Sequence, residues 1–325
     1  MKPFKNYKNA YNFVVLSIFI LPVFLLIYSC KTDKKQSETN IEKEKIEKEK
    51  VVEILTENMD FQMPDTISSG WNTFRYKNSS PQTHFFLIDK YPEGKTSEDA
   101  ENFIAPVFDN AMKLIMEGKT EEGYAEFSKL PEWFNDVIFV GGSGLLSPNQ
   151  VSITNLNLKQ GKYIIECYVK MENGVFHTSM GMTKDLVVTN NDSGYKEPKA
   201  DISINISSTD GIVINDTISS GKHTFSVYFK DQIVHENFVG HDIHLVKLEE
   251  NADIDKLEHW MNWANPEGLI EPAPSHITFL GGVNDMPAGS IGYFTATLEK
   301  GKYALISEVP NALSKNMLQT FVISE

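Results

Sequence analysis

The sequence contains one pattern twice, and this duplication limits the folds that the chain can adopt. The six residues Asp-Thr-Ile-Ser-Ser-Gly occur at 65–70 and again at 216–221, an offset of 151 residues. Further matches follow in the same order at an offset of 140, so the first copy has eleven more residues in its middle. Each copy has roughly 115–140 residues, which is enough to bury a core of its own. The later matches pair Phe139–Gly142 with Phe279–Gly282 and Gly161–Tyr163 with Gly301–Tyr303.

Each copy has the residue alternation of β-strands. In the second copy, Ile202, Ile204 and Ile206 alternate with polar residues, which predicts a half-buried strand. Apolar residues at helical spacing over Ser97–Met116 predict a helix inside the first copy, and a shorter one is expected around Ile254–Trp263. We therefore predict an all-β chain of two tandem β-sandwiches, each with a short helical insertion.

The first fifty residues have the pattern of an export signal followed by a tether. Lys2, Lys5 and Lys8 precede an apolar run at 13–28, and the run ends at Cys30 in a motif that resembles a bacterial lipobox. We predict a signal peptide at 1–29, a lipidated Cys30 and a charged flexible tether at 30–50. The alternative is an uncleaved membrane anchor, although sixteen residues fall short of the about 20 that a span needs.

The charge of the chain restricts its partners. With a formal net charge of −14, it is not expected to bind nucleic acid, and its acidic surface favours basic or metal-bearing partners. The export signal predicts a protein of the bacterial cell envelope that is attached to a membrane through its lipid. The expected membrane is the outer one, with the protein facing the periplasm or the cell surface.

Four residues of the first copy occur in an order typical of a metal site: His84, Cys167, His177 and Met182. A type 1 copper site needs two imidazoles and a thiolate in a plane, with a weak axial thioether. Cys167 is also unusual in itself, because lipidation of Cys30 would leave it without a partner in the chain. It is a buried spectator, an intermolecular disulfide partner or a metal ligand.

The flanks of these residues resemble the cupredoxin family, especially its plastocyanin-like members. Gly161-Lys-Tyr-Ile-Ile-Glu-Cys167 resembles the strand that delivers the cysteine ligand, and His177-Thr-Ser-Met-Gly-Met182 resembles the end of the ligand loop. The resemblance implies Greek-key sandwiches and one mononuclear copper. It also implies that His84, Cys167 and His177 are the equatorial ligands and Met182 the axial one, with Met180 as the alternative. Nine residues separate Cys167 from His177, where plastocyanins have two.

The resemblance spans 59–189 fully and 200–325 in outline. We therefore predict a copper-bearing domain at 51–189, a linker at 190–199 and a second cupredoxin-like domain at 200–325. In that second copy His241 matches His84, but Ser307 and Ala312 stand where Cys167 and His177 are expected. Without a thiolate and a second imidazole, this domain is predicted to be metal-free. His235, His241 and His244 are interpreted as surface histidines, with adventitious metal binding as the alternative.

The functional prediction is a one-electron carrier that exchanges electrons with a redox protein such as a cytochrome or reductase. Enzymatic activity is not expected, because the chain has no His-x-His pair and Cys167 lies between Glu166 and Tyr168, with no histidine beside it. Multicopper oxidases and two-domain nitrite reductases need those histidines for their catalytic copper. Two alternatives remain: copper storage or delivery, and a metal-free binding or structural lipoprotein on cupredoxin-like scaffolds.

Overall fold

The structure of the chain is a computed structural model that describes residues 51–324. The predicted signal peptide, lipidated Cys30 and tether lie outside the described residues. The described residues all belong to one compact unit, so both copies of the repeat can be described together. Within the described range, no helix is both long and apolar enough to cross a membrane.

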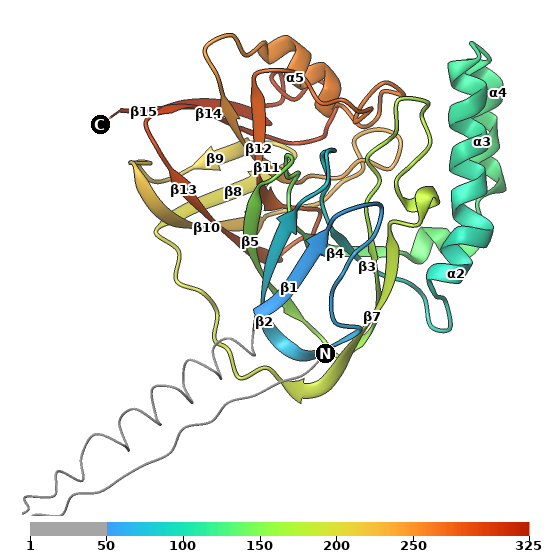
Figure 1. Ribbon diagram of the computed structural model, residues 1–325, viewed down its shortest axis with the longest axis horizontal. Helices are drawn as coiled ribbons and strands as arrows, with labels where there is room; N and C mark the ends of the chain where they lie inside the picture. The colour runs from blue at the N-terminus through green and yellow to red at the C-terminus, as the bar shows by residue number, and fades with distance from the viewer. Residues whose placement is uncertain (1–50, 325) are drawn as a thin grey trace, which may run out of the picture. The chain divides into compact units, whose positions relative to one another are not determined.

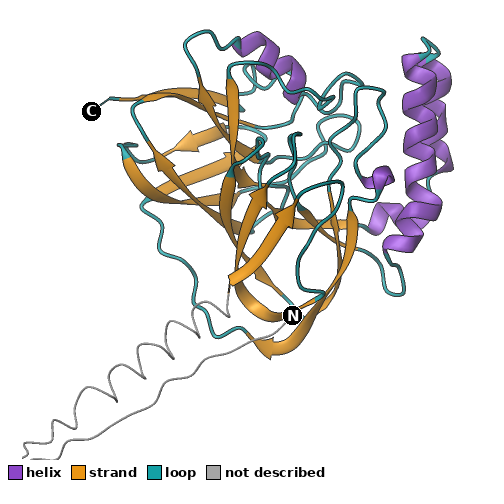
Figure 2. Ribbon diagram, viewed as in Figure 1, coloured by secondary structure: helices purple, strands orange, loops and turns teal. Residues whose placement is uncertain are grey.

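The first copy is built mainly from strands, with helices inserted between its third and fourth strands (Figures 1 and 2). Its strands are β1 (Val51–Thr56), β2 (Thr66–Asn78), β3 (Leu87–Lys90), β4 (Ile138–Gly142), β5 (Val151–Leu158), β6 (Gly161–Glu166) and β7 (Thr183–Asp192). The insertion comprises α2 (Ser97–Asp99), the π-helical turn η1 (Ala100–Ile104), α3 (Ala105–Met116), α4 (Thr120–Glu126) and the short 3-10 turns η2 (Phe127–Lys129) and η3 (Glu132–Asp136). A last turn, η4 (Thr178–Met180), precedes β7.

The second copy repeats this order with a smaller insertion. Its elements are β8 (Ile202–Ser207), β9 (Gly211–Ile214), β10 (Gly221–Phe229), β11 (Ile243–Leu248), α5 (Ile254–Met261), β12 (Ile277–Val283), β13 (Ile291–Leu298), β14 (Gly301–Ile306) and β15 (Leu318–Ile323). The predicted fold class, two β-sandwiches with helical insertions, is confirmed.

The helical insertion of the first copy begins where the sequence predicts. Thr96 and Asp99 form a capping box that satisfies the free N–H groups of the first turn, and Pro106 lies in the first turn of α3. The helix continues to Met116 as predicted. The second helix, α4, was not predicted, because its polar sequence has little apolar periodicity.

The two copies join through one continuous sheet. Its strand order is β4-β3-β6-β7-β2-β5-β13-β10-β8-β9, with β1 beside β2, and a second sheet has the order β12-β11-β14-β15. The join is the antiparallel pairing of β5 with β13, in which Thr154 faces Phe294, its own counterpart at offset 140. A second bridge pairs Ser143 with Val283, again at that offset. The copies are thus related by an internal two-fold axis, as two subunits of a symmetric dimer would be.

Two local features differ from the sequence prediction. β7 continues to Asp192, so the first residues of the predicted 190–199 linker belong to a strand. The repeated hexapeptide also has two conformations: 66–69 pairs with β7, whereas 217–220 is not in a strand. Strand formation needs a pairing partner, and in the described part of the chain no strand lies beside 217–220.

Candidate metal centre

The four predicted ligands come from the ends of neighbouring strands in the first copy. His84 lies before β3, Cys167 directly follows β6, and Met182 directly precedes β7. β6 pairs with both β3 and β7, so these strand ends meet at one edge of the sheet. The fourth residue, His177, lies at the start of η4, and its backbone N–H bonds to the carbonyl of Val169 at 2.8 Å.

The structure brings three of these side chains together with their donor atoms converging. Cys167 Sγ lies 3.8 Å from Nδ1 of His84 and 3.7 Å from Nδ1 of His177, and the two Nδ1 atoms are 3.1 Å apart. The point equidistant from these three atoms is about 2.1 Å from each, which matches the about 2.0–2.1 Å of a metal–imidazole bond. All three residues are 0% exposed.

The chemistry of these donors fits a metal ion. Burial, together with the neighbouring His177, lowers the pKa of His84 to about 3, and burial lowers the pKa of His177 to about 4. Both imidazoles are therefore neutral near pH 7 and offer lone pairs. Burial also raises the pKa of Cys167 to about 12, so its thiolate needs a positive charge beside it. Two imidazole nitrogens and one cysteine sulfur in a plane are the equatorial set of a type 1 copper site.

The two candidate axial methionines have different environments. Met182 is 0% exposed, and its N–H bonds to the carbonyl of His177 at 3.0 Å. Met180, in the short turn η4, is 51% exposed. A thioether that is half in solvent is poorly placed for a buried ion, so the structure favours Met182.

The long loop between Cys167 and His177 is held by the second copy. Lys170 donates its backbone N–H to Leu269 at 2.8 Å, and its carbonyl accepts from Glu271 at 2.9 Å. The Lys170 ammonium also reaches the carbonyl of Pro266 at 2.9 Å. The nine-residue loop therefore forms a contact between the copies and is closed over by the 266–271 segment.

Further contacts bring the second copy close to the ligands. The backbone N–H of Thr83, next to His84, donates to the Glu271 carboxylate at 2.7 Å. The ring of Tyr168, next to Cys167, packs edge-on against Trp263 at 5.7 Å. Sequence reasoning missed Glu271 and Trp263, because nothing in a single sequence tells which loop of one copy lies over the other.

Two of the three histidines interpreted as surface residues are buried, so that prediction is wrong for His241 and His244. His241 and His244 are 0% exposed, and only His235 is partly exposed. His241 bonds to His235 at 2.8 Å and to Asp231 at 3.0 Å. His244 lies within β11 and His241 lies just before it, and this strand is buried, so both side chains are buried with it.

A second buried group, Asp242, His244 and Glu308, also has the composition of a metal site. The backbone N–H of Leu145 donates to Nδ1 of His244 at 2.9 Å, so Nδ1 carries no proton. The proton of this imidazole is then on Nε2, which donates to Asp242. Since a metal on Nε2 would require this proton to leave, the group is better described as a hydrogen-bonded network.

No family model matches the chain, and no curated protein matches it. Among solved structures, reduced auracyanin from Roseiflexus castenholzii is 19% identical, with 43% of this chain and 97% of that chain covered and a TM-score of 0.27. Auracyanin A from Chloroflexus aurantiacus, described as a "blue" copper protein, is 22% identical, and the match covers 43% of this chain and 98% of that chain with a TM-score of 0.25. The copper-containing nitrite reductase from Thermus scotoductus is 10% identical, and the match covers 84% of this chain and 61% of that chain with a TM-score of 0.21. Similarity at this level does not assign a metal, so the assignment uses this chain's own geometry.

Proposed function

We propose that the chain binds one copper ion in its first copy and carries one electron at a time. His84, Cys167 and His177 would be the equatorial ligands and Met182 the axial one. The observation that supports this most strongly is the triangle of Nδ1, Nδ1 and Sγ, with sides of 3.1, 3.7 and 3.8 Å around a fully buried point. When bound, copper would supply a centre that changes between two oxidation states with little change in its ligands.

The surrounding residues favour electron transfer over chemistry on a substrate. The three ligand side chains are fully buried, and the second copy closes the loop that joins two of them. The hydroxyl of Thr178 also fixes this loop, because it donates to the carbonyl of Cys167 at 2.9 Å. A site with four protein ligands and a fixed backbone offers no open position to a substrate.

The cellular setting completes the proposal. The basic and apolar N-terminal residues and the lipobox-like end at Cys30 support a lipid anchor on a bacterial envelope membrane. The net charge of −14 supports a redox partner with a basic docking face, whose association would slow as salt rises. No enzymatic activity is proposed.

Addition of Cu(II) to the purified full-length chain in detergent tests the metal site. An intense visible thiolate-to-copper band is expected at one equivalent, and it should disappear in Cys167→Ser. Cys30→Ser is the matched control, since it removes the other cysteine and should keep the band. A colourless protein would contradict the proposal. If the band forms, rapid loss of copper to a chelator without reversible reduction would favour copper delivery over electron transfer.

A further inference from the structure

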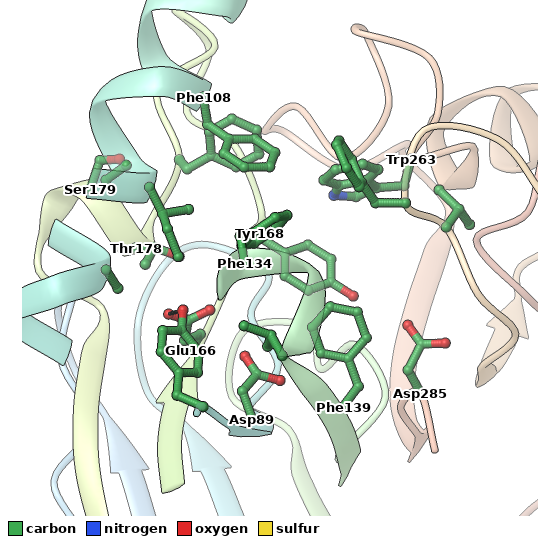
Figure 3. Close-up of a pocket in the computed structure, with 18 of the residues that line it drawn as sticks. Asp89, Phe108, Phe134, Phe139, Glu166, Tyr168, Thr178, Ser179, Trp263 and Asp285 are labelled. Atoms are coloured by element: carbon green, nitrogen blue, oxygen red, sulfur yellow. Dashed lines mark hydrogen bonds between the residues drawn. The ribbon is translucent and has the colours of Figure 1, made fainter. Parts of the chain in front are cut away.

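A cavity of about 100 Å³ lies between the two copies, beside the helical insertion and separate from the metal ligands. We call it the interdomain cavity. Figure 3 shows its two kinds of wall: the rings of Phe108 and Trp263 on one side, and the carboxyl groups of Asp89, Glu166 and Asp285 on the other. An apolar cavity with several acids on one wall is unusual, because burial penalises each charge.

Asp89 is the least satisfied group of this wall. It is 0% exposed, and neither of its carboxylate oxygens receives a hydrogen bond from an N–H or hydroxyl group of the described residues. Its hydrogen-bond partner is another carboxyl group, that of Glu166, which in turn accepts from the Tyr91 hydroxyl at 3.0 Å. Two carboxyl groups can hydrogen-bond only while one of them keeps a proton, so with both ionised Asp89 has no donor among the described residues and indicates a ligand that supplies one.

Asp285 extends the acidic wall from the second copy. It is 7% exposed, and its carboxylate accepts one long hydrogen bond, from Gln232 at 3.3 Å. Burial and the nearby Asp242 and Glu308 raise the pKa of Asp285 well above its usual range. The wall therefore holds more acidic groups than it can ionise unless a positive charge enters the cavity.

The opposite wall restricts the kind of cation. The rings of Tyr168, Phe176 and Trp263 line it, and such faces attract organic cations. Hydrated Mg²⁺ or Ca²⁺ needs oxygen ligands on most sides, and the hydroxyl of Tyr168 is the one oxygen that these three rings offer. An engineered apolar cavity of about 150 Å³ accommodates benzene, so a cavity of this size suits a group of a few heavy atoms.

We propose that the interdomain cavity binds a small primary alkylammonium ion, with its N–H groups donating to Asp89 and Asp285 and its alkyl group against the aromatic wall. The carboxylates need donors, which a primary ammonium has and a quaternary ammonium lacks. This site is distinct from the metal centre, and binding does not require copper.

Isothermal titration of the metal-free, full-length protein with propylammonium at pH 7 tests the proposal. Saturable binding is expected, with 1-propanol, an uncharged ligand of similar size, at least tenfold weaker. Tetramethylammonium should also be at least tenfold weaker, because it has no N–H group. Since no copper is present, failure here leaves the metal centre untouched, and a colourless copper titration leaves this result untouched.

Variants locate the binding in the cavity. Asp89→Asn should weaken propylammonium binding at least tenfold, and Asp136→Asn, which removes an exposed carboxylate outside the cavity, should leave it unchanged. If Asp89→Asn shows no cooperative unfolding transition, Asp285→Asn replaces it and should likewise weaken propylammonium binding. Absence of binding, equal binding of 1-propanol or tetramethylammonium, or displacement by Mg²⁺ at equal concentration would each overturn the proposal.

Discussion

The turns that precede the last strand of each copy share a backbone hydrogen bond and differ in their side chains. In the first copy the N–H of Met182 bonds to the carbonyl of His177 at 3.0 Å, and in the second copy Met317 bonds to Ala312 at 2.7 Å. The second pair follows the first at an offset of 135 residues. This hydrogen bond of the turn therefore does not depend on the ligands, since Ala312 keeps it without an imidazole.

The cysteine position gives the same result. Ser307, the counterpart of Cys167, is 0% exposed, and its hydroxyl donates to Asp242 at 2.6 Å. His241, the counterpart of His84, is turned to His235 and Asp231 instead of to Ser307. The comparison teaches that the first copy adds a metal centre to a frame that is stable without one.

The comparison extends to the face where the copies meet. Strand pairing places Asp89 on β3 opposite Ile164, and Val246 on β11 opposite Ala304, so Val246 is the counterpart of Asp89. An acid in one copy and an apolar residue in the other, both fully buried, indicate that Asp89 is not required by the fold. This supports a role for Asp89 in binding.

The largest expected effect comes from removing an imidazole in each copy. His177→Ala gives the first copy the alanine that the second copy has at Ala312, and it should abolish the copper band. His241→Ala removes the one histidine that the second copy keeps at a ligand position, and it should leave the band intact. Cu(II) titration with visible spectroscopy measures both. A band that survives in His177→Ala, or disappears in a folded His241→Ala, would break the comparison.

The next effect is on stability and its dependence on pH. Burial and the neighbouring Glu166 raise the pKa of Asp89 well above its usual range. The folded protein therefore keeps a proton that the unfolded chain loses near pH 4, so this residue lowers stability progressively as pH rises above about 4. Asp89→Val, which copies Val246, should remove this loss of stability. Its gain in the free energy of unfolding over the parent protein should be larger at pH 8 than at pH 4. The difference should be about 1.4 kcal/mol for each pH unit by which folding raises the pKa of Asp89, up to pH 8.

Urea unfolding of the metal-free protein at pH 4, 6 and 8 measures this difference. Lys, Glu and Asp residues elsewhere contribute equally to both proteins, and Asp285 and Glu166 remain, so the slope should decrease without vanishing. The control is Asp136→Asn, which should follow the parent protein at each pH. A variant as pH-dependent as the parent would show that Asp89 ionises normally.

These results also show how much of the molecule could be read from the sequence. The repeat, the strand periodicity and the order of His84, Cys167 and His177 predicted two sandwiches and a cluster of donor atoms in one of them. Those features depend on local spacing, which one sequence contains. The helix α4 was missed because its sequence carries weak apolar periodicity.

What the sequence did not reveal arises between the copies. The pairing of Thr154 with Phe294, the closure of the Lys170 loop by 266–271 and the interdomain cavity all join residues more than 90 positions apart. Neither spacing nor composition specifies which surfaces of two sandwiches meet. Asp89 and Trp263 therefore had no signal as site residues, although each is visible in the sequence as an acid in a strand or an aromatic near a helix.

A smaller effect is expected at the axial position. Met182→Leu keeps the volume but removes the thioether, so the reduction potential should rise and the visible band should shift. Met180→Leu and Met317→Leu are the controls, one in the exposed part of the same turn and one at the matching position of the other copy. Cyclic voltammetry of the copper-loaded protein separates them. A shift in Met180→Leu alone would reassign the axial ligand.

The smallest effect concerns the residue before each methionine. Gly181 has φ of 101°, a conformation that glycine adopts freely, whereas its counterpart Asn316 has φ of 55°, where asparagine is tolerated. No neighbouring atom crowds a Cβ at Gly181 within 3.8 Å, so a substitution there meets backbone strain and little steric clash. Gly181→Asn should therefore destabilise the metal-free protein by about 1 kcal/mol, and Asn316→Gly should change it by no more than about 0.5 kcal/mol. Urea unfolding measures the change in unfolding free energy for each variant. Equal changes would mean that the two turns have the same backbone strain. Glycine at 181 would then be needed for the neighbouring metal ligand and not for the turn.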